Sequence, residues 1–288
     1  MKPWKATPDG SPIHAMTCDV EDYFQVSAFN DLVDRQDWEK MDCRIPRNVD
    51  LILQRFADAD IKATFFTLGW VAQYHPEVVR RIAAAGHEVA SHGMQHTRVW
   101  QQSSLEFRED ISSARKLLED IAGTPVIGYR AASWSMDGRT PWAHEMLAEA
   151  GYQYSSSIYP INHDSFGVPD AQTSPHRVGD GILEIPPSVA PVLGRNLPAS
   201  GGGYFRLYPL WFSLWLIRRI QAAGDRPFVF YFHPWEMDPG QPRVDGVGAK
   251  ARFRHYLNLT RFDARLQALL DQFNWGRMDE IYLVGAAG

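Results

Sequence analysis

The chain has 288 residues, of which 45% are hydrophobic and 22% are charged, and its net charge at neutral pH is −5. This composition is typical of a globular protein with a sizeable core and excludes an intrinsically disordered chain. It also argues against a nucleic-acid-binding protein, because there is no basic stripe that could neutralise phosphates. A neutral or polymeric substrate fits this charge better.

Cysteine usage and the first residues bear on the compartment. The two cysteines, Cys18 and Cys43, are too few to indicate a disulfide framework, so we expect free thiols. Residues 1–10 lack the apolar core of a secretory signal, which favours a cytoplasmic location, with peripheral attachment to the inner membrane as the alternative. The most apolar later run, residues 207–217, is about half the length of a membrane span and is followed at once by Arg218 and Arg219.

The first half of the chain alternates short apolar runs with amphipathic ones. This pattern predicts strands at residues 13–18, 63–68, 87–90, 126–129 and 154–158, and helices at residues 48–59, 76–85, 104–121 and about 140–150. Strand–helix alternation predicts parallel strands with helical crossovers. The fold class is therefore α/β, and chemistry is expected at the carboxyl ends of the strands.

The second half is less regular. Residues 161–181 are rich in proline, glycine, aspartate and histidine, and a short strand is predicted at 182–187. Residues 193–203 read as a loop whose three final glycines allow close backbone approach to a partner. A helix at 209–223, a strand at 227–232 and one more helix near 260–273 complete the prediction. No stretch has the composition of a linker, so residues 1–288 are expected to form one domain.

Two histidines four residues apart suggest a metal site. On a helical turn, His92 and His96 would lie on one face roughly 5–6 Å apart, and neutral imidazole is a favoured ligand of zinc and similar ions. Alone, the spacing is a weak signal. It gains weight from the acidic run Asp19-Val20-Glu21-Asp22 after the first strand and from His233 after the strand at 227–232.

These motifs occur in the order found in a known enzyme family. The chain contains Asp19–Asp22, His92–His96, Gly128–Trp134 and Phe230–His233. In this order it resembles the polysaccharide deacetylases of carbohydrate esterase family 4, which carry the NodB-homology domain. Residues 154–160 and 194–238 resemble, more narrowly, the branch associated with exopolysaccharide and exosortase loci. The resemblance covers about residues 14–284. It implies a distorted (β/α) barrel of about seven parallel strands, whose part from about 161 to 288 is family-specific.

The resemblance also implies catalytic roles. Asp19 matches the catalytic base and Arg130 the arginine that positions it. His233 matches the general acid, and Ser133 the position whose backbone N–H helps to hold the oxyanion. The motif usually has proline where this chain has Ala132.

The metal ligands follow from the same resemblance. His92 and His96 match two ligands, and Glu21 is favoured as the third, with Asp22 as the alternative. The implied ion is divalent, Zn²⁺ first and Co²⁺, Mn²⁺ or Ni²⁺ as alternatives. A further departure is Ser155, where many relatives carry aspartate.

Three functions remain open. The first is a metal-dependent deacetylase that hydrolyses N-acetyl or O-acetyl groups of a polysaccharide or its lipid-linked oligosaccharide precursor in exopolysaccharide biosynthesis. The second is a hydrolase of cyclic amides, as allantoinase-like members of the scaffold are. The third is a catalytically silent sugar-binding protein. The set of base, metal pair and acid argues against the third.

Aromatic residues near the motifs could be core residues or sugar platforms. We expect Tyr204 and Trp211 to lie in the core. For Trp134 and Trp235, which neighbour motif residues, both readings stay open.

Overall fold

The computed structural model describes residues 4–179, 181–223 and 226–283. Its strands are β1 Ile13–Val20, β2 Thr64–Thr67, β3 Glu88–Ser91, β4 Gly128–Tyr129, β5 Tyr154–Ser155, β6 His176–Val178, β7 Ile182–Glu184, β8 Val189–Val192, β9 Arg195–Pro198, β10 Val229–Phe232 and β11 Asn274–Gly276. Its α-helices are α1 Ile45–Asp58, α2 Gly69–Tyr74, α3 Pro76–Ala84, α4 Ser104–Ala122, α5 Ala143–Glu149, α6 Gly202–Leu207, α7 Leu210–Ala222, α8 Ala249–Tyr256, α9 Phe262–Leu270 and α10 Met278–Tyr282.

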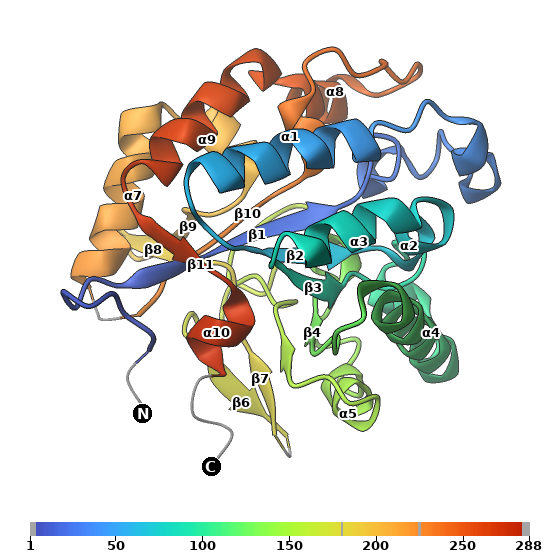
Figure 1. Ribbon diagram of the computed structural model, residues 1–288, viewed down its shortest axis with the longest axis horizontal. Coiled ribbons are helices and arrows are strands. Elements are labelled where there is room, and N and C mark those ends of the chain that lie inside the picture. Colours follow the sequence, from blue (N-terminus) through green and yellow to red (C-terminus); the bar gives the residue numbers. More distant parts are fainter. Residues whose placement is uncertain (1–3, 180, 224–225, 284–288) are drawn as a thin grey trace.

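One curled sheet forms the centre of the molecule (Figure 1). Its strand order is β10-β1-β2-β3-β4-β5-β7-β6, and β11 also pairs with β1. All neighbours are parallel except β6 and β7. Strands such as β2 and β10 are buried along their whole length, which explains their continuous apolar sequences. The predicted distorted barrel of about seven parallel strands is confirmed.

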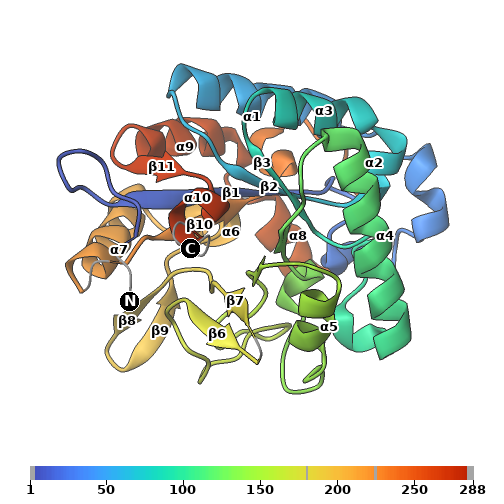
Figure 2. The same ribbon diagram turned by 60° about the horizontal axis from the view of Figure 1, so that its bottom comes forward.

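Helices follow one another around the outside of this sheet. Helices α1, α3, α4 and α5 pack in that order, and α3 and α4 also contact β3 (Figures 1 and 2). The amphipathic patterns of α1 and α4 explain this arrangement, because their apolar residues at helical spacing are the buried ones. The main core lies between the strands and these helices.

The strand register brings the carboxyl ends of distant strands together. Cys18 of β1 lies opposite Phe65 of β2 and Phe232 of β10. Ser91 of β3 lies opposite Tyr129 of β4. The residues that directly follow these positions therefore meet at one end of the sheet.

Several predicted elements differ from the structure. The predicted strand at 154–158 ends at Ser155, because the next two serines bind side chains of the site rather than a neighbouring strand. The predicted loop at 193–203 contains strand β9, which forms a hairpin with β8, and the beginning of α6. The tail has two more helices, α8 and α10, and strand β11, besides the predicted helix. These elements are short, so periodicity did not reveal them.

Cys18 and Cys43 are both free thiols. Among residues 4–179, 181–223 and 226–283, no helix has the length and apolar character needed to cross a membrane.

Candidate metal centre and catalytic site

The motif residues lie at the carboxyl ends of four strands of the sheet, β10, β1, β3 and β4. Asp19 is near the end of β1, and His92, Arg130 and His233 directly follow β3, β4 and β10. All but His233 are almost completely buried, and His233 is half-buried. The register of the sheet thus brings together side chains that lie more than two hundred residues apart in the sequence.

Glu21, His92 and His96 form a buried cluster suited to a metal ion. Each offers one ligand atom, and these three atoms all lie within 4.8 Å of one another. The two imidazole rings are 5.2 Å apart. They meet through a non-helical loop, with His96 at φ +52°, so the helical turn expected for this pair is wrong. The four-residue spacing works here because the loop folds back on itself.

The protonation of these groups fits cation binding. Nδ1 of His92 lies 2.8 Å from the carbonyl oxygen of Arg130 and donates to it, which leaves the Nε2 lone pair available. Burial lowers the pKa of His92 to about 4, so the ring is neutral at pH 7. Burial alone would raise the pKa of Glu21, but the charge and contact of His96, aided by His233 and His92, lower it to about 2. Glu21 is therefore an anion.

An orphaned oxygen supports the same conclusion. Oε2 of Glu21 is buried without a hydrogen-bond partner, although it lies 2.7 Å from Nε2 of His96. The two atoms are close but not aligned for a hydrogen bond, as two ligands of one ion would be. A donor set of two histidines and one glutamate is a common catalytic zinc set.

Two side chains outside the motifs hold the loop that carries this pair. Both carboxylate oxygens of Asp110, on α4, accept from the N–H of Met94 at 3.1 Å. Nε of Arg35 donates to the carbonyl of Gln95 at 3.0 Å. Gly93 lies at φ +77°, and a Cβ there would come within 2.8 Å of Asp110, so glycine is required.

Asp22 lies outside the cluster. Its Oδ2 accepts from the backbone N–H groups of Arg44 and Ile45, at 2.6 and 3.2 Å, and its Oδ1 accepts from Tyr23. These contacts fix the start of α1, and burial raises the pKa of Asp22 to about 6. The structure therefore brings Glu21, and not Asp22, to the two histidines.

Arg130 fixes the predicted base. Its Nη1 donates to Asp19 Oδ1 at 2.5 Å and to Thr17 Oγ1 at 2.8 Å. Its Nη2 donates to Ser156 Oγ at 3.0 Å, and its guanidinium lies 4.0 Å from the ring centre of Phe66. Arg130 is fully buried, so these contacts leave the Asp19 carboxylate a single orientation.

Ser133 lies on a strained turn beside this pair. Ser133 and Trp134 both have left-handed backbone conformations, with φ of +53° and +54°, which are uncommon outside glycine. The Ser133 hydroxyl bonds to that of Ser27. Before the turn, the N–H of Ala131 donates to Ser157 Oγ at 2.9 Å. This bond restrains a backbone that lacks the usual proline.

A buried carboxylate from β7 completes this side. Glu184 accepts from the N–H groups of Ser157 and Ile158 at 2.7 and 2.8 Å, and its other oxygen lies 3.0 Å from Nε2 of His144. Ser155 donates to Ser157 at 2.8 Å. Where many relatives have an aspartate at the position of Ser155, this chain has a serine with a glutamate from the next strand beneath it.

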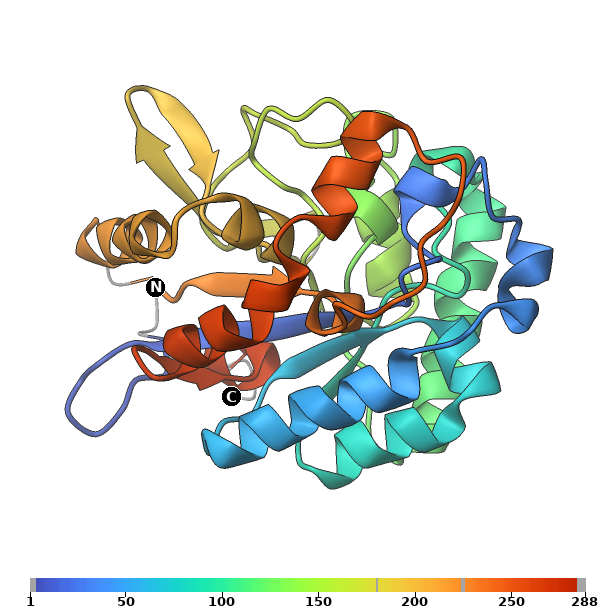
Figure 3. The ribbon, with the colours of Figure 1, turned by 90° about the horizontal axis from the view of Figure 1, so that it is seen from above.

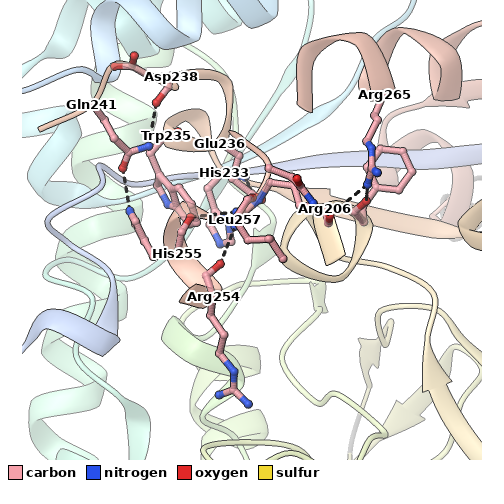
Figure 4. A network of polar contacts seen from close by, with 12 residues as sticks. Arg206, His233, Trp235, Glu236, Asp238, Gln241, Arg254, His255, Leu257 and Arg265 are labelled. Atoms are coloured by element: carbon pink, nitrogen blue, oxygen red, sulfur yellow. Dashed lines mark hydrogen bonds and ion pairs between the residues drawn. The ribbon is translucent and has the colours of Figure 1, made fainter. Parts of the chain in front are cut away.

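The predicted acid, His233, belongs to a charged network (Figure 4). Its Nδ1 lies 2.9 Å from Oε1 of Glu236, and its Nε2 lies 3.7 Å from Oε1 of Glu21. The other oxygen of Glu236 accepts from Nε of Arg206 at 2.7 Å. Arg206, in turn, donates to the carbonyls of His255 and Leu257 at 2.9 and 2.5 Å. The imidazole is thus held from behind, with Nε2 facing the site.

This network keeps a proton on His233. Burial alone would lower its pKa, but the hydrogen bond to Glu236 and the negative charges of Glu21, Glu236 and Asp19 raise the pKa to about 9. A divalent ion on Glu21 would oppose this shift, because a positive charge would then face the imidazole. In either case the carboxylate of Glu236 favours an acid that can donate at neutral pH.

Two aromatic predictions are settled by packing. Trp235 stacks between His233 and His255, with ring distances of 5.2 and 4.1 Å, and its Nε1 donates to Glu21 at 3.4 Å. Trp134 packs against Tyr231 at 4.7 Å. Both tryptophans are 6% exposed, so they are core residues beside the site and offer little surface on which a sugar could stack.

Two of the three glycines at 201–203 are needed for close packing around the site, whereas Gly203 faces open space. A Cβ on Gly202 would come within 2.1 Å of the Glu236 carboxylate, and one on Gly201 within 2.6 Å of Tyr231. The close backbone approach that the sequence predicted for these glycines is therefore to side chains of the same chain, Glu236 and Tyr231. Sequence reasoning missed Asp110, Glu184, Arg206 and Glu236; only Glu236, three residues after His233, offered a local signal.

Two family models match adjoining segments of this chain. Residues 33–155 match the polysaccharide deacetylase family, and residues 156–283 match a domain of unknown function (DUF3473). The peptidoglycan deacetylase of Helicobacter pylori is 28% identical over 141 residues, which are 49% of this chain and 43% of that protein. A chitooligosaccharide deacetylase of Sinorhizobium fredii is 44% identical over 100 residues, or 34% and 46% of the two chains. This chain thus spans less than half the length of these relatives.

Solved structures share the fold. A Mycobacterium smegmatis protein assigned to the polysaccharide deacetylases is 23% identical, with a TM-score of 0.59 over 95% of this chain and 90% of that one. A mutant peptidoglycan deacetylase of Bacillus subtilis is 13% identical, with a TM-score of 0.52 over 97% and 94%. Residues 33–155 match the polysaccharide deacetylase family, in agreement with the resemblance that the motif order indicated.

Two substitutions distinguish Glu21 from Asp22 as the third metal ligand. We expect Glu21→Gln to weaken metal binding, because it replaces an anionic ligand with an amide. Asp22→Asn should keep metal binding and lower the free energy of unfolding by about 0.5–2 kcal/mol, since it weakens the bonds that begin α1. Metal titration and urea unfolding of both variants measure this. The assignment of Glu21 fails if Asp22→Asn loses the metal and Glu21→Gln retains it.

A second prediction concerns the pH dependence of the acid. The rate constant kcat/KM should fall as the pH rises through the pKa of His233, because the proton donor is lost. Glu236→Gln removes a negative neighbour and should move this falling limb to lower pH. Glu88→Gln is the matched control, because Glu88 is an equally buried carboxylate bound to Thr64 and Tyr154 near the opposite ends of the strands. An unmoved limb in Glu236→Gln would contradict this role.

Proposed function

We propose that this chain is a metal-dependent deacetylase, a hydrolase that removes acetyl groups from sugars in a polysaccharide or in its lipid-linked oligosaccharide precursor. One observation carries the proposal. Three buried ligand atoms lie within 4.8 Å of one another, between a carboxylate held by Arg130 and an imidazole that keeps its proton. Amide hydrolysis needs this combination of base, electrophile and acid.

The side chains fall into distinct roles. Glu21, His92 and His96 would hold the ion, with Zn²⁺ as first choice and Co²⁺, Mn²⁺ or Ni²⁺ as alternatives. A bound divalent ion would supply a polarised water and a positive charge beside the acetyl oxygen. Asp19 would accept a proton from the attacking water, and Arg130 keeps its carboxylate oriented for that transfer. The backbone N–H of Ser133 would stabilise the developing oxyanion, as the family resemblance implies.

His233 then donates its proton to the leaving amine, and Glu236 stabilises the imidazolium before transfer. Such acid assistance is typically worth about 10²–10⁴-fold in rate. Trp134 and Trp235 wall the site with apolar surface, which strengthens each of these charge interactions.

The substrate class is supported by relatives rather than by geometry. The matched relatives are named for peptidoglycan and chitooligosaccharides, both of which are polymers or oligomers of acetylated amino sugars. We therefore infer an N-acetylated sugar as substrate, with O-acetyl groups as the alternative. A role in exopolysaccharide biosynthesis rests on the resemblance of residues 154–160 and 194–238, and the cytoplasmic location stays a prediction.

We further propose that residues 1–288 work as a single domain, of which about 161–288 are specific to this branch. The pairing of β10 with β1 supports this, because the acid and the base then stand on adjacent strands. The test of activity is acetate release from a panel of N-acetylated oligosaccharides, run beside a cyclic-ureide assay. Hydrolysis of the ureide alone would replace the proposal with the cyclic-amide alternative, and turnover of neither would reject an active enzyme on these substrates.

Loss of either histidine should strip the metal. We expect His92→Ala and His96→Ala to lose bound metal and turnover while the circular dichroism spectrum stays unchanged, because each removes one of three ligands. A chelator should do the same to the unmodified protein, and added Zn²⁺ should restore activity. His176→Ala, a half-buried histidine on β6, is the control. Elemental analysis that finds undiminished metal in both variants would sink the assignment.

Substitutions of Asp19 and His233 should lower kcat with different dependence on the substrate. Asp19→Asn should retain metal and lose kcat by about 10²-fold or more on every substrate, because no group then accepts the water proton. His233→Ala should lose kcat on an amide but much less on an activated acetyl ester, whose leaving group hardly needs a proton. Parallel kinetics on both substrates decide this. Equal losses for His233→Ala would mean that it serves the metal site, the oxyanion or the packing of Trp235.

A further inference from the structure

Helix α7 exposes an apolar face to solvent. Trp211 and Trp215 are 70% and 40% exposed, and Leu207, at the end of α6, is 47% exposed. These three residues stand four apart along the chain. Trp215 also stacks with Phe212, at a ring distance of 5.5 Å. Trp211 was expected in the core, and this expectation is wrong.

The opposite face of α7 explains why the tryptophans point outward. Leu214, Leu216, Ile217 and Ile220 are buried against the core, so the side of the helix that packs on the protein is already filled. A helix with one face in the core normally has a polar outer face. Here the outer face begins with two tryptophans and ends with Arg218 and Arg219.

The hairpin β8–β9 continues this face. Arg219 joins the two parts, since its guanidinium lies 5.6 Å from the ring centre of Trp215 and its Nε donates to the carbonyl of Pro191 at 3.1 Å. Leu193, at the tip of the hairpin, is 99% exposed. We call this region the α7 surface; it comprises Leu193, Arg195, Leu207, Trp211, Trp215, Arg218 and Arg219.

The charge of the α7 surface has one sign. From Ile185 to Ala223 the sequence contains four arginines and no acidic residue, although the whole chain has a net charge of −5. Of these arginines, Arg195, Arg218 and Arg219 are exposed, and only Arg206 is buried in the site network. The surface is therefore positive on an otherwise negative protein. A second copy of this acidic chain is a poor electrostatic match for it.

Exposed tryptophans could also bind sugars, but the surroundings argue against this. A sugar platform needs several polar side chains that bond to the hydroxyl groups. Trp211 and Trp215 lie beside Phe212, Leu207 and Arg219, of which only the arginine can donate to a hydroxyl group. Tryptophan, leucine and arginine together are the residues that favour the headgroup region of an anionic bilayer. We propose that the α7 surface docks the protein on membranes that contain anionic lipids.

The position of the surface fits such docking. Figures 1 and 3 show α7 and the hairpin at the end of the molecule where β1 begins, and Gln221 of α7 contacts His14 at the start of β1, at 2.7 Å. The site lies at the carboxyl ends of the strands. A docked molecule would therefore turn its site away from the bilayer, toward sugars held at a distance from a lipid anchor. The docking itself is independent of the proposed function.

Vesicle sedimentation tests the proposal with the full chain. We expect the protein to bind vesicles of equal parts phosphatidylglycerol and phosphatidylcholine at low salt. Binding should be much weaker with phosphatidylcholine alone and at about 1 M NaCl, where charge attraction is screened. Failure to bind the anionic vesicles would overturn the proposal.

Matched variants locate the contact. Trp211→Ser should weaken binding by about tenfold, and Arg218→Glu by at least about fivefold, the effect of one basic residue near an anionic surface. Leu105→Ser, a residue on α4 that is 64% exposed, and Arg80→Glu on α3 are the controls and should bind normally. All four positions are exposed, so thermal unfolding should change little.

Three results would reject the lipid assignment. The first is equal vesicle binding by Trp211→Ser and the unmodified protein. The second is saturable binding of a soluble chitooligosaccharide that Trp211→Ser abolishes while the Asp19→Asn variant retains it, which would make the surface a sugar platform. The third is a concentration-dependent dimer in analytical ultracentrifugation that Trp211→Ser dissociates.

Discussion

The site depends on a positive charge that has no access to water. Arg130 is fully buried, and an unpaired guanidinium there would be prohibitively costly, so each of its donors must find a partner. The three partners come from two places: Asp19 and Thr17 lie on β1, and Ser156 lies after β5. Removing one side of such a buried pair typically costs about 3–5 kcal/mol. The need to satisfy Arg130 therefore orients the base and ends the strand β5 early.

The side of the site that carries His233 also depends on pairing buried charges, and here positive and negative groups alternate. His233 carries a proton because Glu236 lies behind it, and Glu236 tolerates full burial because Arg206 lies behind that. The chain of partners ends at the backbone carbonyls of residues 254–257, where charge meets fixed dipoles. Two buried arginines thus lie on either side of the site: Arg130 orients the proposed base, and Arg206 holds the carboxylate that contacts the proposed acid. Their rigidity pre-organises the site at the cost of stability that apolar packing would provide.

Sequence reasoning found the residues whose position follows from strand order. Parallel strands bring their carboxyl ends together, so His92 and His233 could be placed at one end of the sheet before any coordinates. It failed where a side chain reaches sideways from another element, as Asp110 does from the middle of α4, because periodicity says which face a residue occupies and not what it touches. The prediction that Trp211 lies in the core was wrong for another reason. Apolar residues are assigned to the core by default, although many are exposed, and a group of exposed apolar side chains often marks an interaction surface.

The boundary between the two matched family segments runs through the site rather than beside it. Residues 33–155 supply the two histidines and Arg130, and residues 156–283 supply His233, Glu236 and Arg206. The carboxylates of β1 precede both segments, yet β1 is the strand that pairs with β2 on one side and with β10 and β11 on the other. Because the base stands on this shared strand, its distance to the acid is set by backbone hydrogen bonds of the sheet and not by a hinge or an interface. The second segment thus provides the proposed proton donor with its buried partners, and also Glu184, which holds the backbone at Ser157 and Ile158. Its outer helix, α7, contributes no residue to this site, so its exposed face is available for the proposed membrane docking.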